Sequence, residues 1–237
     1  MILERIEGGP FSRVLPAWRG RTVAILAGGP SLTRGQVETV GRAHAAGALR
    51  VAAVNDAYLL APWADVHYAA DVKWHRWHTE GIAKPMLGLT AADVRSAWAS
   101  FGGQRCSIAY GGEYLHDERV HILRNAHEPI HGKGLSLDPE RLVTGRNSGF
   151  QALNLATLAG ATKIVLLGFD GGASADGRTH WHGGHQSPQS PAVYRHFRDA
   201  MSAAERDLEA AGVTVINCSP GSMINSFPKV SLEEALA

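Results

Sequence analysis

Residues 144–170 read TGRNSGFQALNLATLAGATKIVLLGFD, and they carry the clearest helix and strand signals in the sequence. From Phe150 to Leu158 apolar side chains recur at helical spacing, and Gly160 is a typical helix stop. The run TKIVLLG (162–168) is almost continuously apolar, which predicts a strand buried on both faces. A helix that leads directly into such a strand is typical of an α/β protein with a parallel sheet.

The same alternation of helix and strand extends in both directions along the chain. The predicted strands are TVAILA (22–27), RVAAVN (50–55), VHYAA (66–70) and VTVINC (213–218), with weaker signals at 84–89, 105–110 and 119–124. The predicted helices span 32–46, 72–81, 191–211 and 231–236. The sequence therefore predicts one Rossmann-like α/β domain over 1–237, with a mostly parallel sheet and an irregular insert or lid at 85–140.

The composition excludes several classes of protein. The chain has 237 residues, and 23 Lys and Arg balance 22 Asp and Glu, so bulk charge does not indicate a nucleic-acid coat. Cys106 and Cys218 lie far apart in apolar runs, which favours reduced core thiols in a cytoplasmic protein over a disulfide framework or a zinc ribbon. We find neither a secretory signal nor an apolar run of the ~18 residues that a membrane span needs.

Ligands of parallel α/β sheets bind at the carboxyl ends of the strands, so the loops after the predicted strands are candidate sites. The turn AGGPSL (27–32) follows a strand and opens a helix. Its residues Gly28, Gly29, Pro30 and Ser31 either let a ligand anion approach the backbone or form a tight turn with Ser31 as the helix cap. The spacing is neither that of a dinucleotide fingerprint nor that of a P-loop.

Polar residues end the next two predicted strands. Asn55, Asp56 and Asp71 suit a base or a ribose hydroxyl, although Asn and Asp are also common in turns. The aromatic and basic segment KWHRWH (73–78) can bind an anion, whereas the spacing of its two tryptophans favours a core face.

The residues before the helix of the opening stretch form a third candidate. Backbone and side-chain groups there can hold a phosphate or a base edge, and Arg146 can neutralise it; alternatively, they form a helix cap with a glycine for close packing. The residues concerned are Thr144, Gly145, Asn147, Ser148 and Gly149.

The loop DGRTHWHGGH (176–185) carries three histidines within six positions. His180, His182 and His185 can be read as zinc ligands, but no cysteine is near and the helical zinc motif is absent. An imidazole that titrates near neutral pH also suits removal of a proton from a sugar hydroxyl. A solvated polar loop is the third interpretation, and Trp181 and the glycines speak for an ordered loop instead.

Taken together and in order, these motifs resemble the family 42 bacterial sialyltransferases and the related motility-accessory-factor domain. The resemblance rests on LAGGPSL, Asn55, the stretch 144–170, the His-Gly-Gly-His loop and VINCSPGSMINSF, and it covers about residues 22–228. It implies a metal-independent transferase that uses a nucleotide sugar, with a CMP-activated nonulosonic acid as the usual donor. No cofactor is then expected, and neither Mg²⁺ nor Zn²⁺ is favoured.

By position, the resemblance also implies roles for individual residues. His185 would be the general base on the acceptor hydroxyl. The remaining positions would line the donor: Gly29, Pro30, Ser31, Asn55, Asp71, Ser148, Gly149, Ser219, Pro220 and Ser222. The family's tyrosines, which meet the departing phosphate, are missing from 171–182, and Arg178, His180 or His182 can take their place.

The sequence therefore predicts a glycosyltransferase that moves a sugar from a CMP-type donor to the hydroxyl of a glycan or nucleic-acid acceptor. One alternative is a pyrophosphokinase of the pterin-diphosphate type, with Mg²⁺ held by Asp56, Asp71 and Asp170. Another is a nucleotide-binding protein of phage type without turnover. A homo-oligomer is compatible with the sequence.

Overall fold

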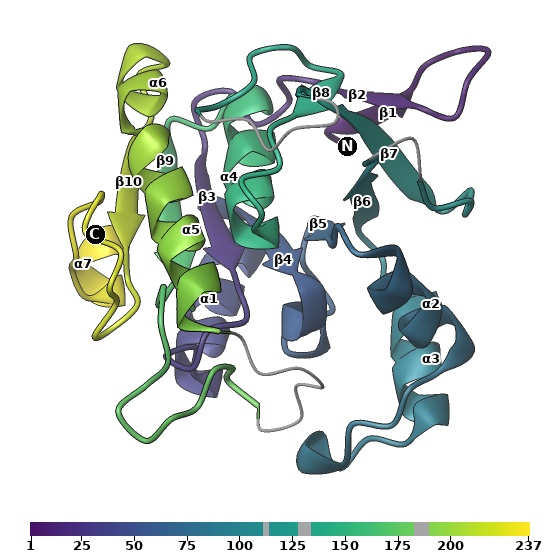
Figure 1. The fold of residues 1–237 in the computed structure, drawn as a ribbon, viewed down its shortest axis with the longest axis horizontal. Helices are drawn as coiled ribbons and strands as arrows, with labels where there is room; N and C mark the ends of the chain where they lie inside the picture. The colour runs from purple at the N-terminus through teal and green to yellow at the C-terminus, as the bar shows by residue number, and fades with distance from the viewer. Residues whose placement is uncertain (111–113, 128–133, 183–189) are drawn as a thin grey trace.

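The computed structural model describes residues 1–110, 114–127, 134–182 and 190–237. Within them, eight strands form one sheet in the order β10-β9-β3-β4-β5-β6-β7-β8, and all neighbours are parallel (Figure 1). The strands are β3 (Thr22–Leu26), β4 (Leu49–Val54), β5 (Val66–Tyr68), β6 (Gln104–Ile108), β7 (Val120–Asn125), β8 (Arg141–Leu142), β9 (Lys163–Leu167) and β10 (Thr214–Asn217). A separate antiparallel pair is formed by β1 (Leu3–Arg5) and β2 (Ser12–Val14). The predicted α/β fold is confirmed.

Helices cover both faces of the sheet. Successive residues of β3 point to opposite faces, so Val23 and Ile25 pack in one core and Ala24 and Leu26 in the other. The first core lies beneath α4 (Ser148–Leu158), α5 (Pro191–Ala203) and α6 (Glu205–Ala210), and the second beneath α1 (Arg34–Ala45), α3 (Ala91–Ser100) and α7 (Leu232–Leu236). These strands are almost purely apolar because their side chains are buried on both faces of the sheet.

Helix α4 is buried on nearly all sides, as its apolar sequence predicts. Its buried amide Asn154 makes three hydrogen bonds to neighbouring backbone. The Asn154 side chain accepts from the backbone N–H groups of Ser136 and Val143 and donates to the carbonyl of Ser136. It thereby fastens the segment before β8 to the centre of the helix.

The chain order creates a switch point in the sheet. From β3 the chain winds outward through β4 to β8, and it then returns to add β9 and β10 on the other side of β3. The crossovers therefore diverge between β3 and β9. A crevice forms at the carboxyl ends of such strands, and this is where open α/β sheets bind ligands.

Three sequence expectations are wrong in detail. The weak strand at 84–89 is instead a tight loop around the 3-10 helix η2 (Pro85–Leu87), closed by a single bridge between Lys84 and Leu89. The helix expected over 191–211 is divided at Ala204 into α5 and α6. Helix α1 begins at Arg34 and is capped by Thr33, so Ser31 is not its cap.

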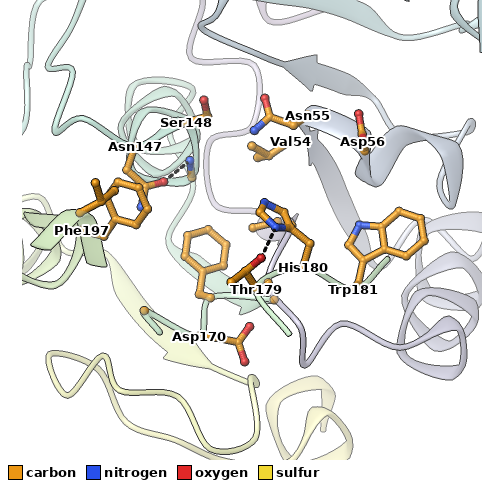
Figure 2. A pocket seen from close by; sticks show the side chains of 18 of the residues that line it. Val54, Asn55, Asp56, Asn147, Ser148, Asp170, Thr179, His180, Trp181 and Phe197 are labelled. Atoms are coloured by element: carbon orange, nitrogen blue, oxygen red, sulfur yellow. Dashed lines mark hydrogen bonds between the residues drawn. The ribbon is translucent and has the colours of Figure 1, made fainter. Parts of the chain in front are cut away.

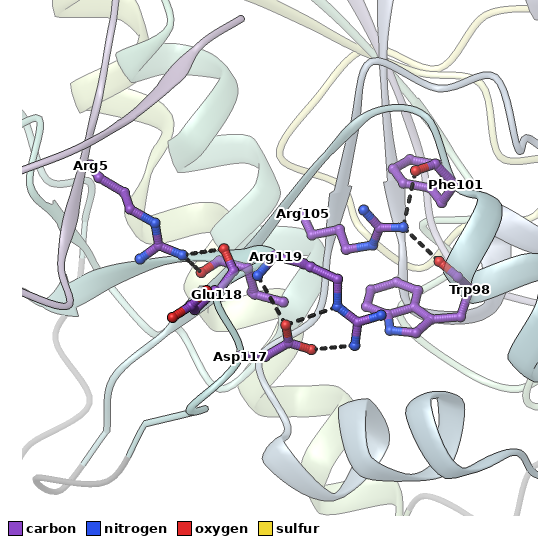
Figure 3. Close-up of polar contacts among 8 residues, drawn as sticks. Arg5, Trp98, Phe101, Arg105, Asp117, Glu118 and Arg119 are labelled. Atoms are coloured by element: carbon purple, nitrogen blue, oxygen red, sulfur yellow. Dashed lines mark hydrogen bonds and ion pairs between the residues drawn. The ribbon is translucent and has the colours of Figure 1, made fainter.

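The stretch 85–140 is more regular than expected, because β6 and β7 are members of the main sheet. Figure 3 shows two arginines that fasten this region. Arg105 donates to the carbonyls of Trp98 and Phe101 at the end of α3, at 2.6 and 3.0 Å. Arg5 donates to the carbonyls of Glu118 and Val120 and ties β1 to the start of β7. Among the described residues, no helix is both long and apolar enough to cross a membrane.

Candidate functional site

A cleft of about 520 Å³ lies at the carboxyl ends of β3, β4, β5 and β9, where the topology predicts a ligand (Figure 2). The predicted site residues that line it are Gly28, Gly29, Asn55, Asp56, Asp71, Asn147, Ser148, Gly149, Asp170, His180 and His182. Those that do not line it are Pro30, Ser31, Thr144, Gly145, Arg178, Ser219, Pro220 and Ser222. His185 lies outside the described residues.

The two glycines of the first turn have different surroundings. A Cβ on Gly29 would lie 1.9 Å from a carboxylate oxygen of Asp170 and 2.3 Å from the carbonyl oxygen of Gly168. A Cβ on Gly28 would meet only the ring of His180, at 3.4 Å. Gly29 is therefore required for close packing of the turn against the end of β9, whereas Gly28 leaves space in the cleft.

Asp170 also holds this turn, through hydrogen bonds from Ser31. The Ser31 hydroxyl donates to its carboxylate at 2.9 Å, and the Ser31 backbone N–H does so at 3.3 Å. Burial raises the pKa of Asp170 above its usual value, and these hydrogen bonds offset part of the rise. Ser31 thus ties the turn after β3 to the loop after β9, a contact that its sequence position does not reveal.

The start of α4 matches the capping interpretation and adds a cleft wall. Asn147 is the cap, because its side-chain oxygen accepts from the N–H of Gly149 at 2.7 Å. A Cβ on Gly149 would lie 2.8 Å from the ring of Phe169, so this glycine serves packing. Ser148 and Arg146 line the cleft beside the cap, and Arg146 is exposed.

The segment 219–222, predicted to close the donor pocket, does not line the cleft and instead fixes the backbone beside it. Ser219 accepts from the N–H of Phe169 at 2.8 Å, and Ser222 donates to the carbonyl of the same residue at 2.7 Å. Both serines are buried, whereas Pro220 is exposed. Their hydroxyls fix the backbone that leads into Asp170.

Asp56 is the centre of a buried polar cluster. One carboxylate oxygen accepts from the indole N–H of Trp74 at 2.8 Å and lies 3.1 Å from Nε2 of His78. The other accepts from the Lys84 ammonium at 2.6 Å and from Nε2 of His182 at 3.0 Å. Burial alone would raise the pKa of Asp56, but the hydrogen bonds from the two histidines and the charge of Lys84 hold it well below its usual value.

The three carboxylates of the magnesium hypothesis all accept hydrogen bonds within the protein. The lone pairs of Asp56 are occupied by donors, Asp71 caps α2 (Val72–Glu80) by accepting from the N–H of Lys73, and Asp170 holds Ser31. Within the described part of the chain, no three His, Cys, Asp or Glu side chains converge as metal ligands. A zinc site that uses His185 falls outside the described residues.

The described part of the histidine loop lies across the cleft. The N–H of Trp181 donates to the carbonyl of Gly28 at 3.1 Å, and Nδ1 of His180 lies 3.1 Å from the Thr179 hydroxyl. Figure 2 shows His180 between the Asn147–Ser148 side and the Asp56–Trp181 side of the cleft. Arg178 instead forms an exposed ion pair with Asp176 at 2.7 Å.

Sequence reasoning missed the wall supplied by α5. Val193, Tyr194 and Phe197 lie at helical spacing near the start of α5 and line the cleft, and Figure 2 shows Phe197 on the side of Asn147. The aromatic pair at i and i+3 near the helix start was the available signal. Lys84 was also missed, because it lies in the stretch 84–89, which the sequence predicts as a strand and which is a loop.

Comparisons with known proteins support the fold. No protein-family model matches the sequence, and no curated protein does so either. The MAf glycosyltransferase from Magnetospirillum magneticum AMB-1 shares the fold, with a TM-score of 0.55 at 17% sequence identity. The match covers 94% of this chain and 36% of the other, so this chain spans about a third of that protein's length. An uncharacterized protein from Listeria monocytogenes aligns with a TM-score of only 0.22 at 12% identity, over 92% of this chain and 23% of the other, which carries no argument.

The class of fold is thereby defined. The chain shares a Rossmann-like α/β fold with the MAf glycosyltransferase, as the order of its motifs indicated. The resemblance of the sequence and the likeness of the structure agree on this point, although they rest on different observations.

Proposed function

We propose that the protein is a nucleotide-sugar glycosyltransferase that uses a CMP-activated nonulosonic acid as donor. The observation that carries the proposal is the position of the cleft, which opens at the switch point between β3 and β9 of a glycosyltransferase fold. The cleft combines a glycine turn, a helix start and aromatic walls, a combination that suits a phosphate, a sugar and a base.

In the proposed reaction, the acceptor hydroxyl attacks the anomeric carbon of the donor sugar. A histidine of the loop takes the hydroxyl proton, the new glycosidic C–O bond forms, and the old one breaks to release the nucleotide as its phosphate. His185 is the base that the sequence motif favours. Arg146 and Lys73 line the cleft and are better placed than Arg178 to offset the charge on the departing phosphate.

We propose that this reaction needs no metal ion. The carboxylates that would hold Mg²⁺ are already hydrogen-bonded within the protein, and the cleft has cations of its own. The acceptor is proposed to be a glycan or a nucleic acid, and the two buried reduced cysteines favour a cytoplasmic location. We also propose that the protein forms a homo-oligomer.

A ligand panel tests the function. Thermal unfolding is measured with CMP, UDP, GDP and ATP, each with EDTA, Mg²⁺ or Zn²⁺. We expect CMP to raise the melting temperature in EDTA, and we expect the protein to release CMP from a CMP-nonulosonic acid in the presence of acceptor. Stabilisation by ATP with Mg²⁺ alone would instead support the pyrophosphokinase. CMP binding without CMP release would support the non-catalytic nucleotide-binding protein.

A further inference from the structure

We propose that the two described histidines of the loop have separate tasks. His182 is a latch: Asp56 holds it and thereby fixes the segment 179–182 across the cleft. His180, and not the His185 that the sequence motif favours, is the imidazole that this segment presents to the reacting hydroxyl. The role of His180 rests on the proposed function, whereas the latch does not depend on which reaction the cleft performs.

The latch is a buried contact to a rigid anchor. The side chain of His182 is 2% exposed and that of Asp56 is 10% exposed, and Nε2 of His182 lies 3.0 Å from the carboxylate. A carboxylate can only accept, so Nε2 of His182 carries the proton. Asp56 cannot follow a moving loop, because Trp74 and Lys84 hold it from α2 and from the residue before η2. Within this contact, Asp56 is a positioning residue.

A second contact, between the backbones of Trp181 and Gly28, fixes the same segment. The Trp181 N–H donates to the carbonyl of Gly28 at 3.1 Å, so residues 181 and 182 are held at consecutive positions. The ring of His180 then lies against the bare face of Gly28, where a Cβ would be in contact at 3.4 Å. With the backbone held at 181 and 182, the position of His180 over the turn is determined.

The surroundings of His180 orient its ring. Nδ1 lies 3.1 Å from the hydroxyl of Thr179, and Thr179 lies beside the hydroxyl of Tyr194. That tyrosine hydroxyl is buried and has no hydrogen bond of standard geometry among the described residues. The contact of Nδ1 with Thr179 and the packing of the ring against Gly28 together hold the imidazole in the cleft.

Matched substitutions separate the two tasks. At position 182, His182→Gln keeps an N–H at the place of Nε2 but removes the imidazole, whereas His182→Leu removes both. At position 180, His180→Asn keeps a donor at the place of Nδ1 and removes Nε2. His44→Gln is the control, because His44 makes a similar 3.0 Å contact to Asp65 far from the cleft.

Two readouts are used, and one needs no substrate. Trypsin cleavage after the exposed Arg178 reports how often the adjoining segment opens, and mass spectrometry identifies the cut. We expect His182→Leu to speed this cleavage about tenfold or more, since it removes a buried hydrogen bond to a charged group. His182→Gln should speed it far less, and His44→Gln should leave it unchanged. The second readout is kcat and KM for CMP release in the presence of acceptor.

For CMP release, we expect His180→Asn to lower kcat about 100-fold or more with little change in KM. His182→Leu should lose much more activity than His182→Gln. The latch is overturned if His182→Leu leaves the cleavage rate unchanged. It is also overturned if both substitutions at 182 abolish kcat equally without faster cleavage, because His182 is then itself catalytic. The role of His180 is overturned if His185→Asn abolishes kcat and His180→Asn does not. Failure of the wild-type protein to release CMP from any donor counts against the proposed function, and the trypsin result still decides the latch.

Discussion

The substitution Gly29→Ala tests the packing of the first turn against the end of β9. The new Cβ would lie 2.3 Å from the carbonyl oxygen of Gly168, where an ordinary contact needs about 3.4 Å. That carbonyl accepts the N–H of Gly29 at 2.9 Å, so the turn cannot move away without losing the bond. The Cβ would also lie 1.9 Å from the carboxylate of Asp170, which is held by Ser31.

The cost follows from these contacts. Overpacking a close-packed site costs about 1–3 kcal/mol. Displacement of Asp170 also breaks its hydrogen bond from Ser31, worth about 1.5–3 kcal/mol for a charged acceptor. We therefore expect Gly29→Ala to lower the free energy of unfolding by about 3–5 kcal/mol. For a chain of this size, the melting temperature falls by about 2–4 °C per kcal/mol, so a loss of about 10 °C is expected.

Scanning calorimetry measures this difference, and Gly28→Ala is the matched control. A Cβ on Gly28 meets only the ring of His180, at an ordinary contact distance, so its melting temperature should stay close to that of the wild type. If the two variants melt at the same temperature, the close approach of Gly29 to β9 does not exist as described.

Two further predictions concern buried polar groups. Asp56 has a lowered pKa in the folded protein, so the stability it contributes is complete above its unfolded value of about 4 and is lost as pH falls through its folded value. Urea titrations from pH 2 to 7 measure the free energy of unfolding, which should be much lower in Asp56→Asn than in the wild type at neutral pH. This difference should narrow only below about pH 4. A difference that does not vary with pH contradicts the prediction. Asn154→Ala strands the N–H groups of Ser136 and Val143 and should cost about 3 kcal/mol or more in the same assay. A loss below about 1 kcal/mol would mean that water replaces the amide.

The local pattern was enough to predict the centre of the fold. The runs at 22–27 and 162–168 became β3 and β9, the neighbouring strands at the switch point, because strands buried on both faces must be apolar throughout. It was not enough at 84–89, where Pro85 and a single bridge close a tight loop. The pattern at 105–110 is only a weak strand signal, yet β6 is a five-residue strand whose Arg105 donates to the end of α3.

The sequence located many of the residues that line the cleft, but not the contacts among them. Strand ends locate Asn55, Asp56 and the Gly28 turn, because parallel strands bring their carboxyl ends to one edge. The pairing of Asp56 with Lys84 could not be predicted, since it joins residues 28 positions apart through a loop of unexpected shape. Asp56, which the sequence predicts to meet ribose or Mg²⁺, lines the cleft and is also hydrogen-bonded to protein groups.

Calorimetric titration of CMP into the metal-free protein shows whether the cleft between β3 and β9 holds the nucleotide of a sugar donor. We predict saturable binding at one site per chain in EDTA, lost in Ser148→Phe, which fills the cleft beside the start of α4 while the protein remains folded. Absence of binding to the wild type, or equal binding to Ser148→Phe, would contradict the account.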